Sequence, residues 1–311
     1  MTASIDLKIA VIVNPRSANG RTGKIWPAIE QTIRDEVGVL DVFHTARPWH
    51  AQELTQHALR NGYNRIVSVG GDGTHHEVLN GFFDGYLPIN PRASFCILPS
   101  GTGSDFARTV GYRRWQDAVP AILGTKSIRI DIGRATFSLA NGTKDVRYFM
   151  NVADFGIGGA VVDRVNRSSK RFGPFVTFLW GLLSTLPRFR APMVEIDIDG
   201  TPVSQRTLNV MIAKGRYYGG GIHVAKQATL TSGQFEVIIV NDLSLWTALR
   251  SLPILYSGAY IEREDLVRCF RATRIVAQSS EVVLLDLDGE QPGRLPAAIE
   301  LLPSALELVI G

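Results

Sequence analysis

The chain has 311 residues, of which 45% are hydrophobic and 20% are charged, a balance that excludes an intrinsically disordered protein and predicts two domains. Lys and Arg number 33 against 29 Asp and Glu, so the net charge of +4 does not indicate nucleic-acid binding, and we expect no nucleic-acid partner. Two cysteines exclude a disulfide scaffold and a thiolate zinc site.

The first 133 residues alternate between short apolar runs and amphipathic stretches. Short strands separated by helices predict an α/β nucleotide-binding domain, with a parallel sheet covered on both faces. In such sheets, ligands bind at the carboxyl ends of the strands. The predicted strands are residues 9–13, 39–44, 65–69 and 94–98, and the predicted helices are residues 22–36, 48–61, 74–83 and a helix starting at residue 105.

The pattern changes after residue 133. Asn141-Gly142 and Asp199-Gly200 are hairpin-type dipeptides between alternating runs, which is typical of antiparallel strands. We therefore predict an α/β domain over residues 1–133 and an antiparallel β-sandwich domain over residues 134–311, whose extreme C-terminus could pack back on the first domain. Helices near residues 161–186 and 243–260 interrupt the sandwich, and its last strand-like runs are residues 273–278, 282–287, 299–302 and 306–310.

The N-terminal residues lack the charged and apolar regions of a secretory signal, and no run of about 18 apolar residues occurs. We therefore expect a cytoplasmic protein.

The first of three Gly-rich segments runs from Asn14 to Lys24, after a predicted strand. It is not a Walker A loop, because Ala18 and Ile25 stand where that pattern requires Gly and Ser or Thr. Its backbone N–H groups, Arg21 and Lys24 could still bind phosphates at a helix N-terminus. The alternative is an ordinary strand-to-helix loop.

The second segment, Gly70-Gly71-Asp72-Gly73-Thr74, follows the strand at residues 65–69. Its glycines allow a pyrophosphate to approach the backbone closely, and Thr74 could cap the next helix. Asp72 would repel phosphate oxygens unless Mg²⁺ lies between them, so the segment predicts a metal-bound phosphate.

The third segment contains Ser100, Gly101, Thr102 and Gly103, and Asp105 follows at a helix start. Asp105 by itself could be a plain helix-terminal acid. Because all three segments follow strands of one parallel sheet, together they favour a nucleoside triphosphate bound with a metal ion.

The three Gly-rich segments are followed by further motifs along the chain, and the order of all these motifs indicates a family. The chain resembles the diacylglycerol kinase catalytic domain of bacterial soluble lipid kinases, a family related to sphingosine kinases and more distantly to NAD kinases and phosphofructokinases. That family's fold is an α/β nucleotide domain followed by a β-sandwich. The resemblance covers nearly the whole chain and is carried by VNPRSANGRTGK (13–24), GGDGT (70–74), LPSGTGSDFA (98–107), SIRIDIG (127–133), FMNVADFGIGG (149–159), YYGGGIHVA (217–225) and LDLDGE (285–290).

The resemblance implies an ATP- and Mg²⁺-dependent kinase that phosphorylates a hydroxyl of a membrane lipid, which could be diacylglycerol-like, phosphatidylglycerol-like or sphingoid. It makes Glu290 the general base and Asp72 an essential acid, and it places Asp72, Asp105 and Asp131 near metal and substrate. The implied ATP site comprises Asn14, Arg21, Lys24, Gly70, Gly71, Asp72, Gly73, Thr74, Ser100, Gly101, Thr102 and Gly103.

Two alternatives remain open from the sequence. One is another GGDGT kinase, acting on NAD or a sugar phosphate, which would need a polar acceptor pocket in the second domain. The other is a lipid-binding module that has lost catalysis, against which the retained acidic residues count.

The chain departs from the family pattern in one segment. Lys226 replaces the usual Pro and Ser232 replaces the usual Asp in a loop where the family holds a structural Mg²⁺. Losing a carboxylate and adding a cation both weaken a magnesium site. We expect no tightly held structural metal there.

Residues 164–190 hold six basic side chains and no acidic one, around an aromatic and aliphatic core. The composition favours peripheral docking on the inner face of the membrane, where the lipid substrate resides. The alternative is a core helix that covers the sandwich. A homodimer is left open as the oligomeric state.

Overall fold

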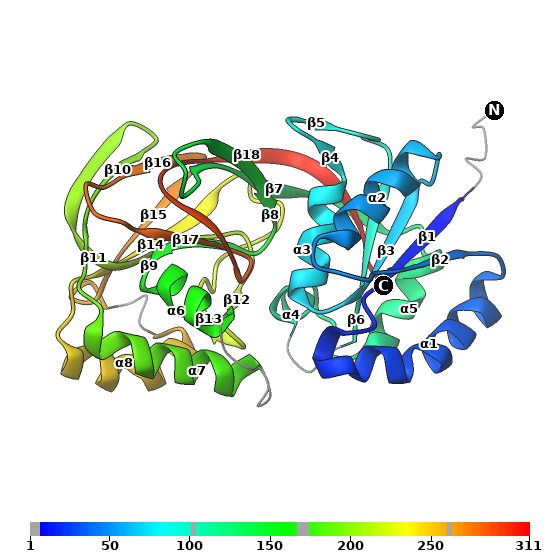
Figure 1. Ribbon diagram of the computed structural model, residues 1–311, viewed down its shortest axis with the longest axis horizontal. Coiled ribbons are helices and arrows are strands. Elements are labelled where there is room, and N and C mark those ends of the chain that lie inside the picture. The colour runs from blue at the N-terminus through cyan, green and yellow to red at the C-terminus, as the bar shows by residue number, and fades with distance from the viewer. Residues whose placement is uncertain (1–6, 101–103, 167–173, 260–262) are drawn as a thin grey trace. The chain divides into compact units, whose positions relative to one another are not determined.

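The computed structural model describes residues 7–100, 104–166, 174–259 and 263–311, and the chain divides into two compact units (Figure 1). Unit 1 comprises Met1–Ile130 and Ser304–Gly311, and unit 2 comprises Asp131–Pro303. We had predicted a boundary at residue 133, with residues 304–311 in the second domain and able to pack back. The structure groups those last residues with unit 1.

Unit 1 is built on a parallel sheet whose strands are the apolar runs of the sequence. The order is β6-β3-β1-β2, and every residue of β1, β3 and β6 is buried. The end of β18 extends the sheet beyond β6, with Leu308 opposite Phe95 in a parallel pair. The strands are β1 (Ile9–Val13), β2 (Asp41–His44), β3 (Arg65–Gly70), β6 (Ser94–Pro99) and β18 (Glu290–Val309).

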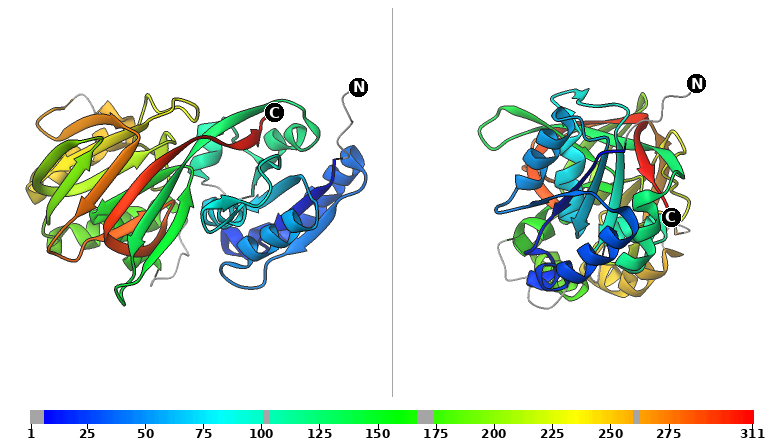
Figure 2. Two further views of the ribbon diagram at one scale, coloured as in Figure 1. Left: turned by 90° about the horizontal axis from the view of Figure 1, so that it is seen from above. Right: turned by 90° about the vertical axis from the view of Figure 1, so that its right-hand side faces the viewer.

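Helices cover both faces of this sheet, which explains why its strands are apolar throughout (Figure 2). Helix α2 packs with α3, and α1 packs with α5. A single turn, Ser17–Gly20, precedes α1, and a small hairpin of β4 (Phe83–Asp84) and β5 (Leu87–Pro88) follows α3. The helices are α1 (Arg21–Val37), α2 (His50–Arg60), α3 (Asp72–Gly81), α4 (Asp105–Val110) and α5 (Trp115–Leu123).

Unit 2 is antiparallel and has a core of aliphatic and aromatic side chains, among them Phe149, Phe155 and Phe235. One run of strands has the order β15-β14-β11-β10-β16-β18, while β9 pairs with both β11 and β17, and β7 pairs with β8. The strands are β7 (Ser127–Ser138), β8 (Lys144–Phe149), β9 (Val152–Gly156), β10 (Met193–Ile198), β11 (Thr201–Ala213), β12 (Tyr217–Tyr218), β13 (Ile222–His223), β14 (Phe235–Asn241), β15 (Val267–Ala272), β16 (Arg274–Gln278) and β17 (Leu284–Leu287). The two units confirm the predicted fold class.

Three helices accompany the strands of unit 2: α6 (Ile157–Asn166), α7 (Pro174–Thr185) and α8 (Leu245–Ser257). The helix predicted near residues 161–186 is two helices, and the basic residues Arg167, Lys170 and Arg171 lie outside the described residues. No helix among the described residues is both long enough and apolar enough to cross a membrane.

Candidate active site

Three loops leave the carboxyl edge of the unit 1 sheet, and hydrogen bonds join them to one another. The Asn14 amide donates to Thr74 Oγ1 at 3.0 Å, which links the loops after β1 and β3. Thr22 Oγ1 and Ser100 Oγ lie 2.7 Å apart, which links the loops after β1 and β6. The Ser100 backbone N–H donates to the Gly70 carbonyl at 3.0 Å. The three predicted segments therefore meet at one place in unit 1.

The first loop ends in the N-terminus of α1. Gly20 precedes the helix with φ of 81°, in the left-handed region that glycine adopts readily. Arg21 and Lys24 occupy the first turn with exposed side chains. Two cations at the positive end of a helix are suited to bind phosphate oxygens.

The second loop turns into α3 earlier than predicted. The helix begins at Asp72 rather than residue 74, and its N-cap is Gly71 rather than Thr74. Thr74 is instead buried in the first turn, next to Gly73. A Cβ added at Gly70 would lie 2.4 Å from Thr74 Oγ1, so only glycine fits there. Helix-capping preference predicted Thr74 as the N-cap because it is the first hydroxyl residue of the segment. In the structure, the Thr74 side chain lies inside the first turn and packs against Gly70.

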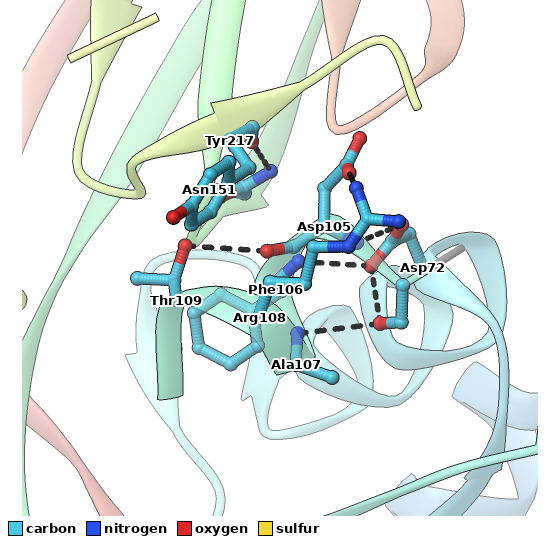
Figure 3. Close-up of polar contacts among 9 residues, drawn as sticks. Asp72, Asp105, Phe106, Ala107, Arg108, Thr109, Asn151 and Tyr217 are labelled. Atoms are coloured by element: carbon cyan, nitrogen blue, oxygen red, sulfur yellow. Dashed lines mark hydrogen bonds and ion pairs between the residues drawn. The ribbon is translucent and has the colours of Figure 1, made fainter. Parts of the chain in front are cut away.

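The half-buried Asp72 carboxylate joins the second loop to the third (Figure 3). Its Oδ1 accepts from Ser104 Oγ at 2.7 Å and from the Phe106 backbone N–H at 3.2 Å. Its Oδ2 accepts from the Asp105 backbone N–H at 2.8 Å. Three donors from the start of α4 thus fix the carboxylate at the loop junction, in an orientation set before any ligand binds.

Asp105 begins α4 and is 5% exposed. Its carboxylate accepts from Arg108 Nη1 at 3.3 Å, and its carbonyl accepts from Thr109 Oγ1 at 3.2 Å (Figure 3). Ser104 is the N-cap and accepts from the Ala107 N–H. Asp105 is therefore a helix-terminal acid whose backbone N–H contacts Asp72 and whose carboxylate pairs with Arg108. The predicted residues Gly101, Thr102 and Gly103 lie outside the described residues.

Glu290 stands in unit 2, half-buried at the start of β18 and directly after a tight turn. Asp288 and Gly289 form this turn with positive φ values of 52° and 89°. The Asp288 carboxylate holds the turn, because it accepts 3.0 Å hydrogen bonds from the backbone N–H groups of residues 150, 151 and 152. The hairpin interpretation and the general-base interpretation are thus compatible. The anchoring role of Asp288 was not predicted, because its partners are distant in sequence.

Asp131 also belongs to unit 2, where it is 2% exposed. Its Oδ2 lies 2.8 Å from Lys214 Nζ, in an ion pair whose lysine is fully buried, and it accepts from the Gly233 N–H at 2.7 Å. Asp72 and Asp105, by contrast, belong to unit 1. The sequence did not single out Lys214, since a lysine before a glycine is ordinarily exposed.

A second pair of acids is buried in unit 2 and was missed by sequence reasoning. Asp154 in β9 and Asp286 in β17 are cross-strand neighbours, and both are 0% exposed. Burial raises the pKa of Asp154 to about 6. Burial and the Asp154 charge raise the pKa of Asp286 well above its usual value. Two such carboxyls favour holding a proton between them.

A cavity of about 100 Å³ lies in unit 2, between its helices and strands. Its walls are mostly aliphatic, and its polar residues are few, including Asn209, Tyr218 and Ser251. The apolar lining comprises Ile157, Val161, Leu182, Leu186, Leu208, Met211, Ile222, Val240, Leu243 and Ala248, together with Gly158. This lining suits hydrocarbon and offers no charged side chain to a polar ligand.

Two family models match this chain. Residues 8–135 match the diacylglycerol kinase catalytic domain, and residues 151–310 match the YegS C-terminal NAD kinase β-sandwich-like domain. The two matches fall on the α/β region and on the antiparallel region, in that order.

Similar proteins cover almost the same length. A diacylglycerol kinase of Bacillus subtilis is 28% identical over 92% of this chain and 90% of its own length. A protein of Pseudomonas putida named probable lipid kinase YegS-like is 29% identical over 89% of this chain and 87% of its own. A solved diacylglycerol kinase structure from Bacillus anthracis, 21% identical, superposes with a TM-score of 0.71 over 98% of this chain and 97% of its own, which shows the fold.

Proposed function

Because the chain belongs to the diacylglycerol kinase catalytic-domain family, with a YegS-type C-terminal domain, we propose that it transfers the γ-phosphate of ATP to a hydroxyl group of a membrane lipid. Unit 1 supplies the nucleotide site and unit 2 supplies the acceptor site.

The junction of the three loops supports the nucleotide site. Arg21 and Lys24 neutralise phosphate charge, and the backbone of the Gly70–Thr74 loop allows the phosphates to approach closely. Asp72 and Asp105 are the carboxylates that would hold Mg²⁺, because they are the acids at the starts of α3 and α4, next to the loops, and Mg²⁺ binds through carboxylate oxygens. Among the described residues, no three His, Cys, Asp or Glu side chains gather as a metal cage. That fits Mg²⁺, which commonly binds one or two carboxylates together with substrate phosphates.

Glu290 acts as the general base. As the lipid oxygen forms its bond to the γ-phosphorus, the bond to the ADP oxygen breaks and the hydroxyl proton passes to the Glu290 carboxylate. Bound Mg²⁺ would stabilise the negative charge that shifts to the leaving ADP. The turn held by Asp288 keeps the base at a fixed position in unit 2.

The apolar cavity of unit 2 is the observation that favours a lipid acceptor. A kinase acting on NAD or a sugar phosphate would need cations and hydrogen-bond donors in its acceptor pocket. The cavity lining offers hydrocarbon instead, with Asn209, Tyr218 and Ser251 among its few polar groups. Aliphatic walls are suited to an acyl or alkyl chain.

The experiment supplies purified protein with ATP and Mg²⁺ and compares three acceptors in detergent micelles: diacylglycerol, phosphatidylglycerol and a sphingoid base. NAD and a sugar phosphate form two further arms. We expect phosphate to appear in a lipid, identified by mass spectrometry. Phosphorylation of NAD or of the sugar phosphate alone, or no ATP consumption with any acceptor, would contradict the proposal.

Glu290→Gln tests the base directly. We expect kcat to fall by about 10²–10⁴-fold with little change in the KM for ATP, since the change removes a proton acceptor and leaves unit 1 intact. Glu264→Gln, at an exposed acid of unit 2, is the matched control and should retain full turnover. Equal turnover of both variants would remove Glu290 from the mechanism.

A further inference from the structure

The side chain of Lys214 is enclosed in unit 2 by oxygen atoms. Lys214 follows β11 and is 0% exposed. Its Nζ donates to Asp131 Oδ2 at 2.8 Å, to Ser232 Oγ at 3.0 Å and to the Gln234 carbonyl at 3.0 Å. An ammonium group has three protons, so these three acceptors satisfy it completely.

The same acceptors fold the loop over residues 229–234 around the ammonium. The Gly233 N–H donates to Asp131 Oδ2 at 2.7 Å, and the Asp131 N–H donates to the Leu230 carbonyl at 2.7 Å. Ser232 Oγ lies 2.8 Å from the Gln234 carbonyl. The buried ammonium of Lys214 is therefore hydrogen-bonded both to the loop and to Asp131 at the start of unit 2.

The family resemblance implies a structural Mg²⁺ at this loop, coordinated by an acid at the position of Ser232. The residues present do not fit that ion. One carboxylate, one hydroxyl and one carbonyl remain, and all three already accept from Lys214. A divalent ion beside the ammonium would meet a like charge in a buried site, where repulsion is strong.

We propose that the Lys214 ammonium is the resident cation of this loop and takes the place of a structural metal. Unit 2 then folds without Mg²⁺, and the magnesium requirement of this chain concerns the nucleotide alone. The inference concerns stability, so it stands or falls separately from the proposed function.

The test uses the full chain without nucleotide, after treatment with a chelator. Thermal unfolding is followed with and without millimolar Mg²⁺, and hydrogen exchange is measured in the peptide over residues 225–236. We expect neither the unfolding temperature nor the exchange of that peptide to respond to Mg²⁺. Any Mg²⁺ bound weakly by the acids of unit 1 would leave that peptide unchanged. Mg²⁺-dependent protection of that peptide in the wild-type chain would overturn the proposal.

Substitutions of Lys214 distinguish the effect of its charge from the effect of its packing. Lys214→Met keeps the length and removes the charge, so the Asp131 carboxylate is left buried without its cation. We expect its unfolding temperature to fall by roughly 10 °C. Lys226→Met, at an exposed lysine shortly before this loop, is the control and should be unchanged. Lys214→Met with Asp131→Asn should recover a large part of the loss, whereas a mere packing defect would not recover.

A variant in which the metal site is rebuilt should respond to Mg²⁺, unlike the wild-type chain. Lys214→Asn combined with Ser232→Asp supplies two carboxylates and no cation, so we expect Mg²⁺ to raise its unfolding temperature by several degrees. Ser232→Asp alone keeps the ammonium and should not respond. If Lys214→Met does not fold, the proposal is still tested by the Mg²⁺ response of the double variant, of Ser232→Asp alone and of the wild-type chain. A Mg²⁺ response of Ser232→Asp equal to that of the double variant would refute it.

Discussion

The Asp72 carboxylate shows how one side chain can combine a structural and a proposed chemical role. It accepts three hydrogen bonds from Ser104, Asp105 and Phe106 at the start of α4, and it faces the loop junction of unit 1 (Figure 3). Its direction is therefore fixed by the protein and not by the ligand, so the entropy cost of ordering this side chain is not added to the cost of binding.

Asp72→Asn tests this double role. The amide presents two protons to the backbone N–H donors that now point at a carboxylate, so we expect a loss of roughly 1–3 kcal/mol in unfolding free energy. Removing the charge should also lower kcat at least 100-fold. Urea unfolding and ATP turnover measure the two effects. Asp84→Asn, whose acid is exposed, should change neither. An unfolding free energy equal to that of the wild type would show that the three hydrogen bonds to Asp72 do not stabilise the fold.

The carboxyl pair of Asp154 and Asp286 predicts a pH dependence of stability. The folded-state pKa of Asp154 is raised to about 6 from 3.8, so between these values the folded protein retains a proton that the unfolded chain has lost. Stability therefore falls as pH rises from about 4 through about 6. The raised pKa of Asp286 extends the fall to higher pH.

Asp154→Asn replaces the protonated acid with a neutral isostere and should remove much of that fall. Relative to the wild type, we expect it to gain about 1–3 kcal/mol at pH 8 compared with pH 4.5. Urea unfolding across this pH range measures the difference. Asp197→Asn, in β10 of the same unit, is the control and should follow the wild-type curve. Parallel curves for wild type and Asp154→Asn would show that the pair does not share a proton.

At the scale of elements, α7 combines two kinds of surface. Thr177 is buried and Gly181 packs against Val161 and Val165 of α6. Val176, Trp180 and Leu183 are 48%, 49% and 42% exposed and recur at spacings of four and three, so they form one stripe. The helix therefore contributes to the fold of unit 2 and also leaves an apolar face uncovered, which favours membrane docking of this segment.

Replacing Val176, Trp180 and Leu183 with Ser tests the docking. We expect co-sedimentation with vesicles containing anionic phospholipid to fall several-fold, since the apolar face of an interfacial helix supplies much of its binding. Serine at Val39, Leu87 and Val282, which are 90%, 72% and 69% exposed, is the matched control. Equal sedimentation of the two triple variants would indicate that α7 only covers the sandwich.

The apolar strands of unit 1 could be predicted closely from the sequence, because β1, β3 and β6 are continuous hydrophobic runs that end in loop residues. β18 could not. We predicted strands at residues 299–302 and 306–310, whereas the strand runs from Glu290 to Val309. Three prolines interrupt its pattern, and its pairing with strands of both units depends on contacts that no local pattern records.

In the candidate site, too, local sequence features could be predicted and long-range contacts could not. The glycines and acids of its loops could be identified from their order along the chain. The partners of Asp131 and Asp288 could not, because Lys214 and residues 150–152 are distant in sequence and have no special composition.

At the scale of the whole molecule, β18 is a component of both units. Leu308 and Val309 are 0% exposed in unit 1, and β18 pairs there with β6. Leu308→Ala should therefore destabilise unit 1 by about 2–5 kcal/mol, through lost burial and the cavity it leaves. Hydrogen exchange in β6 reports the effect, and Leu87→Ala, at an exposed leucine of the same unit, is the control. Unchanged protection of β6 would show that the sheet does not need this strand.

The shared strand also has a consequence for how the protein is made on the ribosome. Translation proceeds from the N-terminus, so β1, β2, β3 and β6 leave the exit tunnel long before residues 304–311 are synthesised. Until then the nascent sheet has an unpaired edge at β6, and such edges promote association between chains. Unit 1, although most of it is encoded first, can be completed only after unit 2 has been translated.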